Sequence, residues 1–212
     1  MLRVSVFSLA ALLVSCVSAH AATVQYGETK AGGGSIVPVG GTSVASDNAA
    51  YADPPESGDG GAASDWVWVG NTDTNDTAEF EFKFDLSGLD LTTVSLELDW
   101  SVDNFGWVEL NSGDETMGTS DDVAILTDAT GNFESIHSVT LTGPDNFVQG
   151  ENTLTFYLRD RFFDDESEDG GQAAFTAAVS VTATPIPVPA SFPLVVGGVA
   201  ALGVLRARRR KR

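Results

Sequence analysis

The sequence predicts an all-β protein: one antiparallel β-sandwich, of the jelly-roll type, between two terminal segments of a different character. Three observations carry this prediction. Apolar and polar residues alternate with period two in several stretches between residues 66 and 184, which is typical of strands with one buried face. Gly, Asn, Asp and Pro turn signals separate these stretches. No soluble amphipathic helix of convincing length is present.

Residues 1–21 have the layout of a cleavable signal peptide. A basic start at Arg3 is followed by an apolar run, and the small-residue pattern Ala19-His20-Ala21 precedes Ala22. The stretch Leu13-Val14-Ser15-Cys16 permits a second interpretation, a lipoprotein signal whose Cys16 is acylated. Both interpretations predict export by the secretion machinery. Because Cys16 is the only cysteine of the chain, the mature domain would lack disulfides.

Residues 22–65 form a Gly/Ser/Asp-rich segment in which we expect only short edge strands, at 23–26 and 35–39. The β-sandwich core is assigned to residues 66–184. Its clearest strand, 78–85, alternates apolar residues with charged ones. Further strands are expected at 66–69, 94–100, 107–110, 123–126, 135–142, 154–158 and 175–181.

Four pieces of this region resemble the galactose-binding-like jelly roll, a fold that many carbohydrate-binding modules use. They are FDLSGLD at 84–90, DWSVDN at 99–104, WVELN at 107–111 and FVQGENTL at 147–154. The last two match the strand end "lNG" and the strand start "GxNxL" of that fold. This chain has Ser112 where the family has Gly, with Gly113 following, so the turn is expected to be longer. The resemblance implies the fold more than any ligand.

Residues 185–212 form a tail in three parts: a Pro-rich start, an uncharged Gly-containing stretch, and an Arg-rich end. The apolar part, 192–205, is expected to enter a membrane, with the basic residues on the cytoplasmic side. This tail resembles the VPLPA-CTERM variety of the PEP-CTERM sorting signals of Gram-negative bacteria. The motif positions are Ile186, Pro187, Val188, Pro189 and Ala190, and Ile186 and Val188 depart from the VPLPA form by conservative changes.

The resemblance implies an exosortase as partner, a membrane-embedded protease-transpeptidase that recognises the motif and removes the helix. A permanent, unprocessed tail anchor is the alternative interpretation. With either outcome, the protein is expected at the cell surface or outside the cell.

The charge distribution argues against a nucleic-acid partner. The chain has 30 Asp and Glu against 11 Lys and Arg, a formal charge of −19, and most of the basic residues lie in the two terminal segments. Only Lys30, Lys83, Arg159 and Arg161 remain between them. Phosphate neutralisation needs clustered Lys and Arg, which this domain does not have.

Catalytic residue patterns are scarce, so we predict a protein that is not an enzyme. The mature domain has one histidine, His137, in a strand-like segment, and no cysteine. The nucleophile-elbow and phosphate-loop motifs are both missing from the sequence. Carboxylates are numerous, but their abundance is not evidence of a paired acid and base.

Aromatic and polar residues around 68–111 offer a better case for binding. Sugar rings pack their CH faces on Trp or Tyr, while Asp and Asn take the hydroxyl hydrogen bonds. Trp100 continues a buried alternation and is assigned to the core, as is one of Trp66 and Trp68. The candidate sugar-binding residues are Trp68, Asp103, Asn104, Trp107 and Asn111.

Two acidic stretches are candidate sites for a structural Ca²⁺ ion. The first provides oxygen ligands at alternating positions, but the glycine and the final glutamate of an EF-hand loop are replaced by Asp76 and Phe82. The second is a dense acidic loop, for which a solvated hairpin is an equally good explanation. The candidate ligands are Asn71, Asp73, Asn75, Asp76, Asp164 and Asp165.

Together these observations predict a non-enzymatic secreted or surface-displayed protein of a Gram-negative bacterium, associated with extracellular polysaccharide as a carbohydrate-binding or structural module. A secreted glycan hydrolase and a self-assembling surface or filament component are the alternatives.

Overall fold

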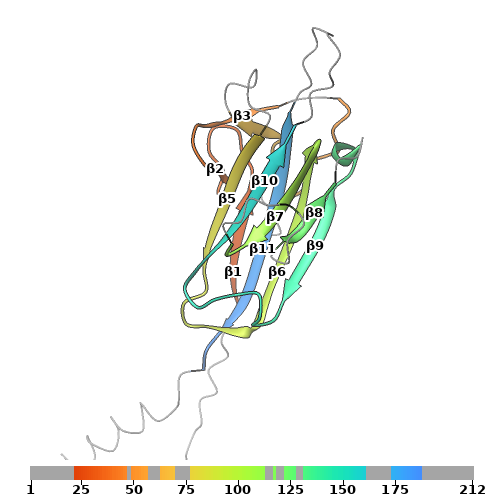
Figure 1. Cartoon of the computed structure of the whole chain (residues 1–212). Coiled ribbons are helices and arrows are strands. Elements are labelled where there is room, and N and C mark those ends of the chain that lie inside the picture. The colour runs from red at the N-terminus through yellow and green to blue at the C-terminus, as the bar shows by residue number, and fades with distance from the viewer. Residues whose placement is uncertain are drawn as a thin grey trace, which may run out of the picture.

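The computed structural model describes residues 22–46, 49–56, 63–69, 77–112, 117, 122–127, 131–160 and 173–187. These residues form two antiparallel β-sheets packed face to face, which confirms the all-β sandwich (Figure 1). The described residues contain no α-helix, and their one helical element is the short 3₁₀ turn η1 (Asn132–Glu134).

Six strands make up the first sheet, called sheet A. Its order is β3-β4-β11-β6-β9, and β1 pairs with β11 beside this path. The bounds are β1 Thr23–Glu28, β3 Ser43–Ala45, β4 Val67–Val69, β6 Leu89–Asp103, β9 His137–Thr142 and β11 Ala174–Pro185.

Sheet B has five strands in the order β2-β5-β10-β7-β8. Of the eight strands from β4 to β11, four lie in each sheet. Their order is β4-β11-β6-β9 in sheet A and β5-β10-β7-β8 in sheet B. This arrangement is consistent with a jelly roll. The bounds are β2 Val37–Pro38, β5 Thr77–Asp85, β7 Phe105–Leu110, β8 Asp122–Leu126 and β10 Glu151–Arg159.

Aromatic rings fill the core between the sheets. Phe156 of β10 is fully buried, with its ring centroid 4.9 Å from Phe175 of β11 and 6.3 Å from Trp100 of β6. Phe80 of β5 packs on the same Phe175 at 5.0 Å. These contacts join the two central strands of each sheet, so the expected alternation in β5, β6, β10 and β11 corresponds to a real buried face.

Residues 22–65 contribute more to the sandwich than two edge strands. β1 pairs with β11 from Thr23↔Ala183 to Glu28↔Ala178. β2 joins sheet B, and β3 pairs with β4 in sheet A. The expected strands did not include β3, because its three residues follow the turn at Gly40-Gly41 and have only Val44 as a large apolar residue.

β1 also closes one side of the sandwich. The Gln25 side chain donates to the Asp85 carbonyl at 2.7 Å and accepts from the Asp85 amide at 3.0 Å, which links sheet A to the end of β5 in sheet B. At Gly27, an added Cβ would lie 2.7 Å from the Phe82 ring. Only glycine therefore permits β1 to lie this close to the core.

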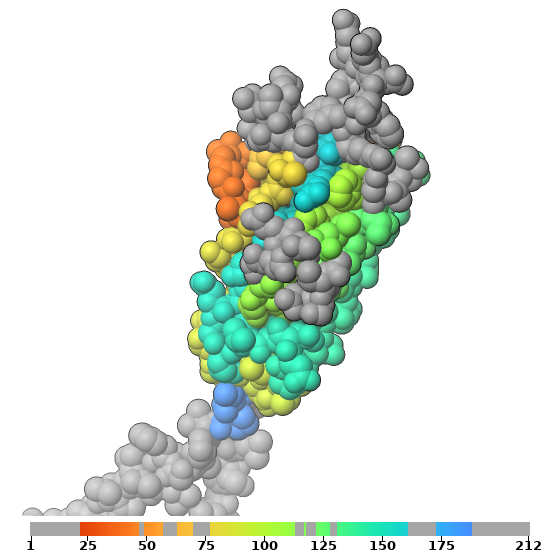
Figure 2. All heavy atoms as spheres, in the orientation of Figure 1, coloured from red at the N-terminus to blue at the C-terminus, as the bar shows by residue number. Residues whose placement is uncertain are grey.

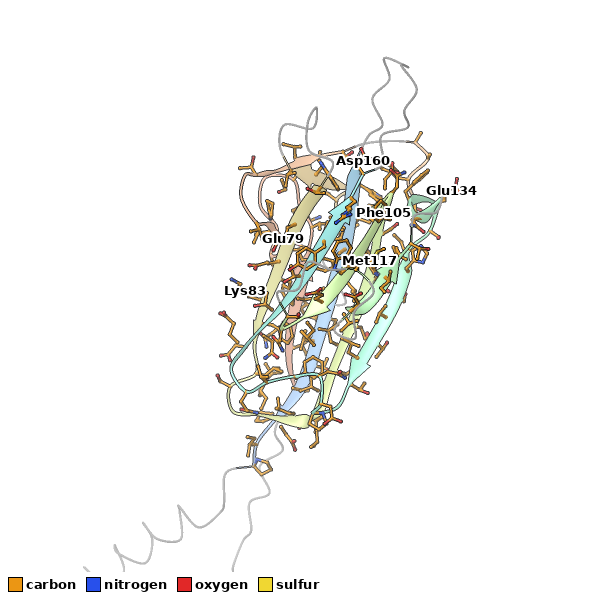
Figure 3. All side chains as sticks on the ribbon, in the orientation of Figure 1. Glu79, Lys83, Phe105, Met117, Glu134 and Asp160 are labelled. Carbon is orange, nitrogen blue, oxygen red and sulfur yellow. The ribbon has the colours of Figure 1, made fainter. Side chains whose placement is uncertain are left out.

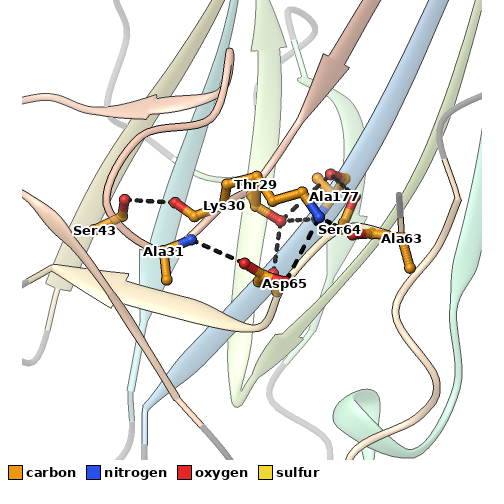
Figure 4. A network of polar contacts seen from close by, with 8 residues as sticks. All are labelled: Thr29, Lys30, Ala31, Ser43, Ala63, Ser64, Asp65 and Ala177. Atoms are coloured by element: carbon orange, nitrogen blue, oxygen red, sulfur yellow. Dashed lines mark hydrogen bonds and ion pairs between the residues drawn. The ribbon is translucent and has the colours of Figure 1, made fainter. Parts of the chain in front are cut away.

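A polar network marks the point where β1 stops pairing with β11 and β4 takes over (Figure 4). The Ala177 carbonyl of β11 accepts from the Thr29 amide at 3.1 Å and from the Ser64 hydroxyl at 2.8 Å. Lys30 adds an ion pair to Asp65 at 3.6 Å and a hydrogen bond to the Ala63 carbonyl. Because Thr29 and Ser64 are buried, these bonds satisfy backbone groups that the strand exchange would otherwise leave unpaired.

The described chain begins and ends at the same end of the elongated sandwich (Figure 1), and Figure 2 shows the blue end of the described chain protruding there. Thr23 lies opposite Ala183, so the start of β1 and the end of β11 are neighbours. We call this end the terminal pole. The opposite end, where β5 begins at Thr77 and β10 ends at Arg159, is the distal pole.

Candidate functional site

The outer face of sheet B is buried in one part, along β7 and β10. On β7 and β10, Val108, Phe156 and Leu158 point into the core, so their neighbours in sequence point outward. Those neighbours are nevertheless buried, with exposed fractions of 2% for Trp107, 0% for Glu109, 4% for Thr155 and 8% for Tyr157.

Two aromatic rings and a guanidinium stack on this face. Trp107 and Tyr157 are register partners, and their rings lie 5.2 Å apart at an interplanar angle of 23°. The guanidinium carbon of Arg159 lies 5.3 Å from the centroid of the Trp107 ring. Such a cation–π contact fixes the long Arg159 side chain against the sheet.

A cavity of about 480 Å³ opens beside this stack, near the distal pole. We call it the distal cavity. Its volume lies within the range of about 300–1,000 Å³ that is usual for small-molecule sites. Five segments line it: the turn after β2, the end of β4, the start of β5, β7 and the end of β10. The lining residues are Val39, Gly40, Gly41, Val69, Thr77, Ala78, Glu79, Trp107, Tyr157, Leu158 and Arg159.

The distal cavity combines the groups that a polar ring-shaped ligand needs. Glu79, on the outward face of β5, provides a carboxylate, and its position is seen in Figure 3. Thr77 adds an exposed hydroxyl and Arg159 an exposed cation, while Val39 supplies exposed apolar surface.

The two tryptophans that the sequence singled out as sugar contacts are both buried. Trp68 is 0% exposed and belongs to the hydrophobic core, so its ring is not available for stacking on a sugar. Trp107 lines the distal cavity, but its ring is 2% exposed and is covered by Arg159 and Tyr157. Buried tryptophans of this kind contribute packing, and neither is retained here as a direct ligand contact.

Asp103 and Asn104 lie at the distal pole but do not line the cavity. The Asp103 carboxylate accepts from the Tyr51 hydroxyl at 3.2 Å and from Nδ2 of Asn104 at 2.6 Å. Asn132 of η1 donates to the Asn104 carbonyl at 2.7 Å. We call Tyr51, Asp103, Asn104, Asn132 and Asp160 the polar cluster.

The surroundings of Asp103 in the polar cluster raise its pKa. Burial raises the pKa of Asp103 to about 6, the Tyr51 hydrogen bond opposes this shift, and the charge of Asp160 adds to it. Burial also raises the pKa of the Tyr51 hydroxyl, and the Asp103 charge raises it further.

Asp103→Asn is expected to change how stability depends on pH. The Asp103 pKa is higher in the folded protein than the value of about 3.9 in an unfolded chain, so the folded state loses stability as pH rises from about 4 to 6. At about pH 7.5 the variant should be more stable than wild type by up to roughly 2 kcal/mol, and this advantage should disappear near pH 4. Thermal denaturation across this pH range measures the effect.

The exposed Asp145→Asn change is the matched control, because it removes the same charge far from the polar cluster. Parallel stability curves for wild type and Asp103→Asn would contradict the prediction.

Asn111 has a structural position, in the half of the sandwich away from the distal cavity. It takes a left-handed conformation with φ of 58°, and its side-chain oxygen accepts from the Thr153 amide at 2.9 Å. Its amide donates to the buried Asn152 at 2.9 Å. The five predicted sugar-binding residues therefore occupy the core, the cavity wall, the polar cluster and a strand end, and do not form one site.

The metal and sorting predictions fall mostly beyond the part of the chain that the structure describes. The six candidate calcium ligands Asn71, Asp73, Asn75, Asp76, Asp164 and Asp165 all lie outside it, as do Val188, Pro189 and Ala190. Ile186 is half-exposed, and its amide donates to the Gly88 carbonyl at 2.9 Å. The described residues contain neither a group of metal-ligating side chains nor a helix that could cross a membrane.

Sequence reasoning missed Glu79, Tyr157 and Arg159 as site residues. One signal was present: β10 places Tyr157, a large aromatic residue, on the face where the alternation calls for a polar one. The turn of Gly40 and Gly41, which completes the cavity wall, gave no such signal.

Comparison with solved structures adds a distant likeness. No family model matches the chain, and no curated protein matches it. Among solved structures, the chain is similar to the native structure of a family 35 carbohydrate binding module from Clostridium thermocellum, with a TM-score of 0.32 and 13% identity over 74% of this chain and 90% of that chain. At this level the likeness carries no argument about function.

Proposed function

We propose that this protein is a non-enzymatic, secreted or surface-displayed module that binds extracellular polysaccharide through the distal cavity. The single observation that carries the proposal is the composition of that cavity: a carboxylate, a hydroxyl, a guanidinium and apolar surface around about 480 Å³. A sugar residue offers hydroxyls to the polar groups and CH surface to the apolar ones.

Export and sorting belong to the same proposal, and the terminal sequences support them. The signal-like residues 1–21 and the tail 185–212 favour delivery to the envelope of a Gram-negative bacterium and recognition by an exosortase. The galactose-binding-like form of the jelly roll and a structural Ca²⁺ ion remain part of the proposal.

The site is tested by filling the cavity without disturbing the core. Thr77 lines the cavity and is exposed, so Thr77→Trp should place an indole in the binding space while β5 keeps its pairing. On a glycan array and by calorimetry, we expect wild type to bind at least one extracellular polysaccharide and Thr77→Trp to bind it at least tenfold more weakly, a loss of about 1.4 kcal/mol.

Thr140→Trp is the matched control, since Thr140 is exposed on β9 of the other sheet. Equal binding by Thr77→Trp and wild type would place the ligand elsewhere. Failure of the wild type to bind any polysaccharide would refute the proposed function.

The rival function of a glycan hydrolase has one observation in its favour. A carboxyl group whose pKa is about 6, as at Asp103, is the kind used as a general acid. However, neither Asp103 nor Asp160 lines the distal cavity. Release of reducing ends from the bound polysaccharide by wild type, abolished in Asp103→Asn, would favour the hydrolase over the binding module.

A further inference from the structure

Arg159 is an unusual cation for this protein. Three Lys or Arg side chains occur among the described residues, and Lys30 and Lys83 are each paired with a carboxylate, Asp65 at 3.6 Å and Glu81 at 3.1 Å. Within the same described residues, Arg159 has no ion pair, although the chain has 30 acidic residues. Its guanidinium lies on the Trp107 ring and lines the distal cavity.

An exposed ion pair contributes little to stability, so the fold does not require the exposed Arg159 guanidinium to hold a carboxylate of the protein itself. Contact with Trp107 holds the guanidinium against the sheet, and among the described residues it makes no ion pair with a carboxylate. A planar guanidinium held in this way is suited to bidentate recognition of an anionic group.

We propose that the ligand of the distal cavity is an acidic sugar, whose carboxylate or sulfate group pairs with Arg159. This inference rests on the proposed function and names its ligand class. The other cavity groups fit the remainder of such a sugar. Glu79 and Thr77 accept or exchange hydrogen bonds with ring hydroxyls, and Val39 offers apolar surface to a CH face.

The high negative charge of the protein does not prevent this pairing. At physiological ionic strength, charges more than about 8 Å apart are largely screened, so distant carboxylates have little effect at the cavity. Glu79 is the acidic group that lines the same cavity, and it must face the hydroxyls and not the anion of the sugar. The site should therefore require an anion at one end of the sugar and tolerate none at the other.

Two ligand pairs, each an acidic polysaccharide and its uncharged counterpart, test the inference: polygalacturonate against its methyl ester, and dextran sulfate against dextran. Binding is measured by calorimetry at physiological salt, once with millimolar Ca²⁺ and once with EGTA. The first condition keeps the proposed structural ion in place, and the second shows whether calcium bridges an acidic protein to an acidic polymer. We expect at least one acidic member to bind about tenfold or more tightly than its neutral partner. The pair that shows this difference identifies the anion as carboxylate or sulfate.

Three variants locate the effect. Arg159→Gln should weaken binding of the acidic ligand about tenfold, and Arg159→Lys should weaken it less, because lysine keeps the charge but loses the planar fork. Lys83→Gln is the matched control: it removes one positive charge from β5 of the same sheet, at a residue outside the cavity lining. Melting temperatures of all variants establish that each is folded.

The outcomes separate the inference from the function on which it rests. Equal losses of affinity in Arg159→Gln and Lys83→Gln, or equal affinity for the charged and neutral polysaccharides of each pair, would refute the inference that the ligand is acidic. Binding only of neutral polysaccharides, lost in Thr77→Trp, would keep the proposed function and refute this inference. Absence of binding to every polysaccharide would refute both.

Discussion

Phe156→Ala is expected to lower the free energy of unfolding by about 3–5 kcal/mol, the usual cost of deleting a buried aromatic ring. Phe156 is fully buried at the centre of β10 and packs on both Phe175 and Trp100, so its removal leaves a cavity at the junction of the two sheets. Urea denaturation followed by circular dichroism measures the change.

Thr153→Ala on the same strand is the matched control. Its side chain alternates away from the core and is half-buried, and its backbone pairing with Asn111 does not depend on the hydroxyl. We expect a change of about 0.5 kcal/mol or less. Comparable losses in both variants would show that Phe156 is not a central core residue.

Asn152→Ala should lower the free energy of unfolding by about 2–4 kcal/mol, a large effect for a polar residue. The Asn152 side chain is 0% exposed. Its oxygen accepts from the Val148 amide and from Asn111, and its nitrogen donates to the Val148 and Gly150 carbonyls, each at 2.9 Å. Alanine leaves several of these buried groups without a partner.

The exposed Asn146 gives the control, because it has one hydrogen bond, from Nδ2 to the Thr142 carbonyl at 3.1 Å. Asn146→Ala should cost about 1 kcal/mol or less. Asn152→Asp tests the direction of the bonds: it keeps the acceptor and removes both donors, so it should also destabilise. A loss no larger in Asn152→Ala than in Asn146→Ala would contradict the role of this side chain.

Asn152 also shows that a sequence motif can predict a structural role without predicting a ligand contact. The stretch that matches "GxNxL" does begin a strand, β10, because Asn152 closes the loop before it with its own side chain. The neighbouring match at Asn111 has the same physical basis, a left-handed residue that ends β7 and joins it to β10. Side chains of this kind satisfy backbone groups at strand ends, and they need not touch a ligand.

Period-two alternation located most strands because it records which side chains lie between the sheets. It could not describe the outer face of sheet B, where Trp107 and Glu109 are buried although they point away from the core. Alternation predicts exposure only when nothing covers the second face. Coverage of this outer face explains why the Trp107 ring, which lies beneath Arg159, is not accessible. Trp68 is inaccessible for a different reason, because it belongs to the hydrophobic core.

The distal cavity could not be predicted from the sequence, because segments far apart in the chain form it together. The turn at Gly40-Gly41, Thr77 and Arg159 come together only because β2, β5 and β10 are successive neighbours in sheet B. Neither composition nor spacing encodes that order directly. The sequence identifies Arg159 as one of few cations. Only the folded chain shows that Arg159 has no carboxylate partner among the described residues.

The position of both chain ends at the terminal pole has a mechanical consequence. β11 has 12 residues, so the distal cavity stands about 40 Å from the point where the chain leaves the sandwich. A polysaccharide pulling on Arg159 against a tether beyond Pro185 would load β10 and β11 along their length. The ladder hydrogen bonds run perpendicular to the strands, so such a load shears many bonds together and does not open them one at a time. The fold would therefore resist traction between the proposed ligand and the proposed tail anchor.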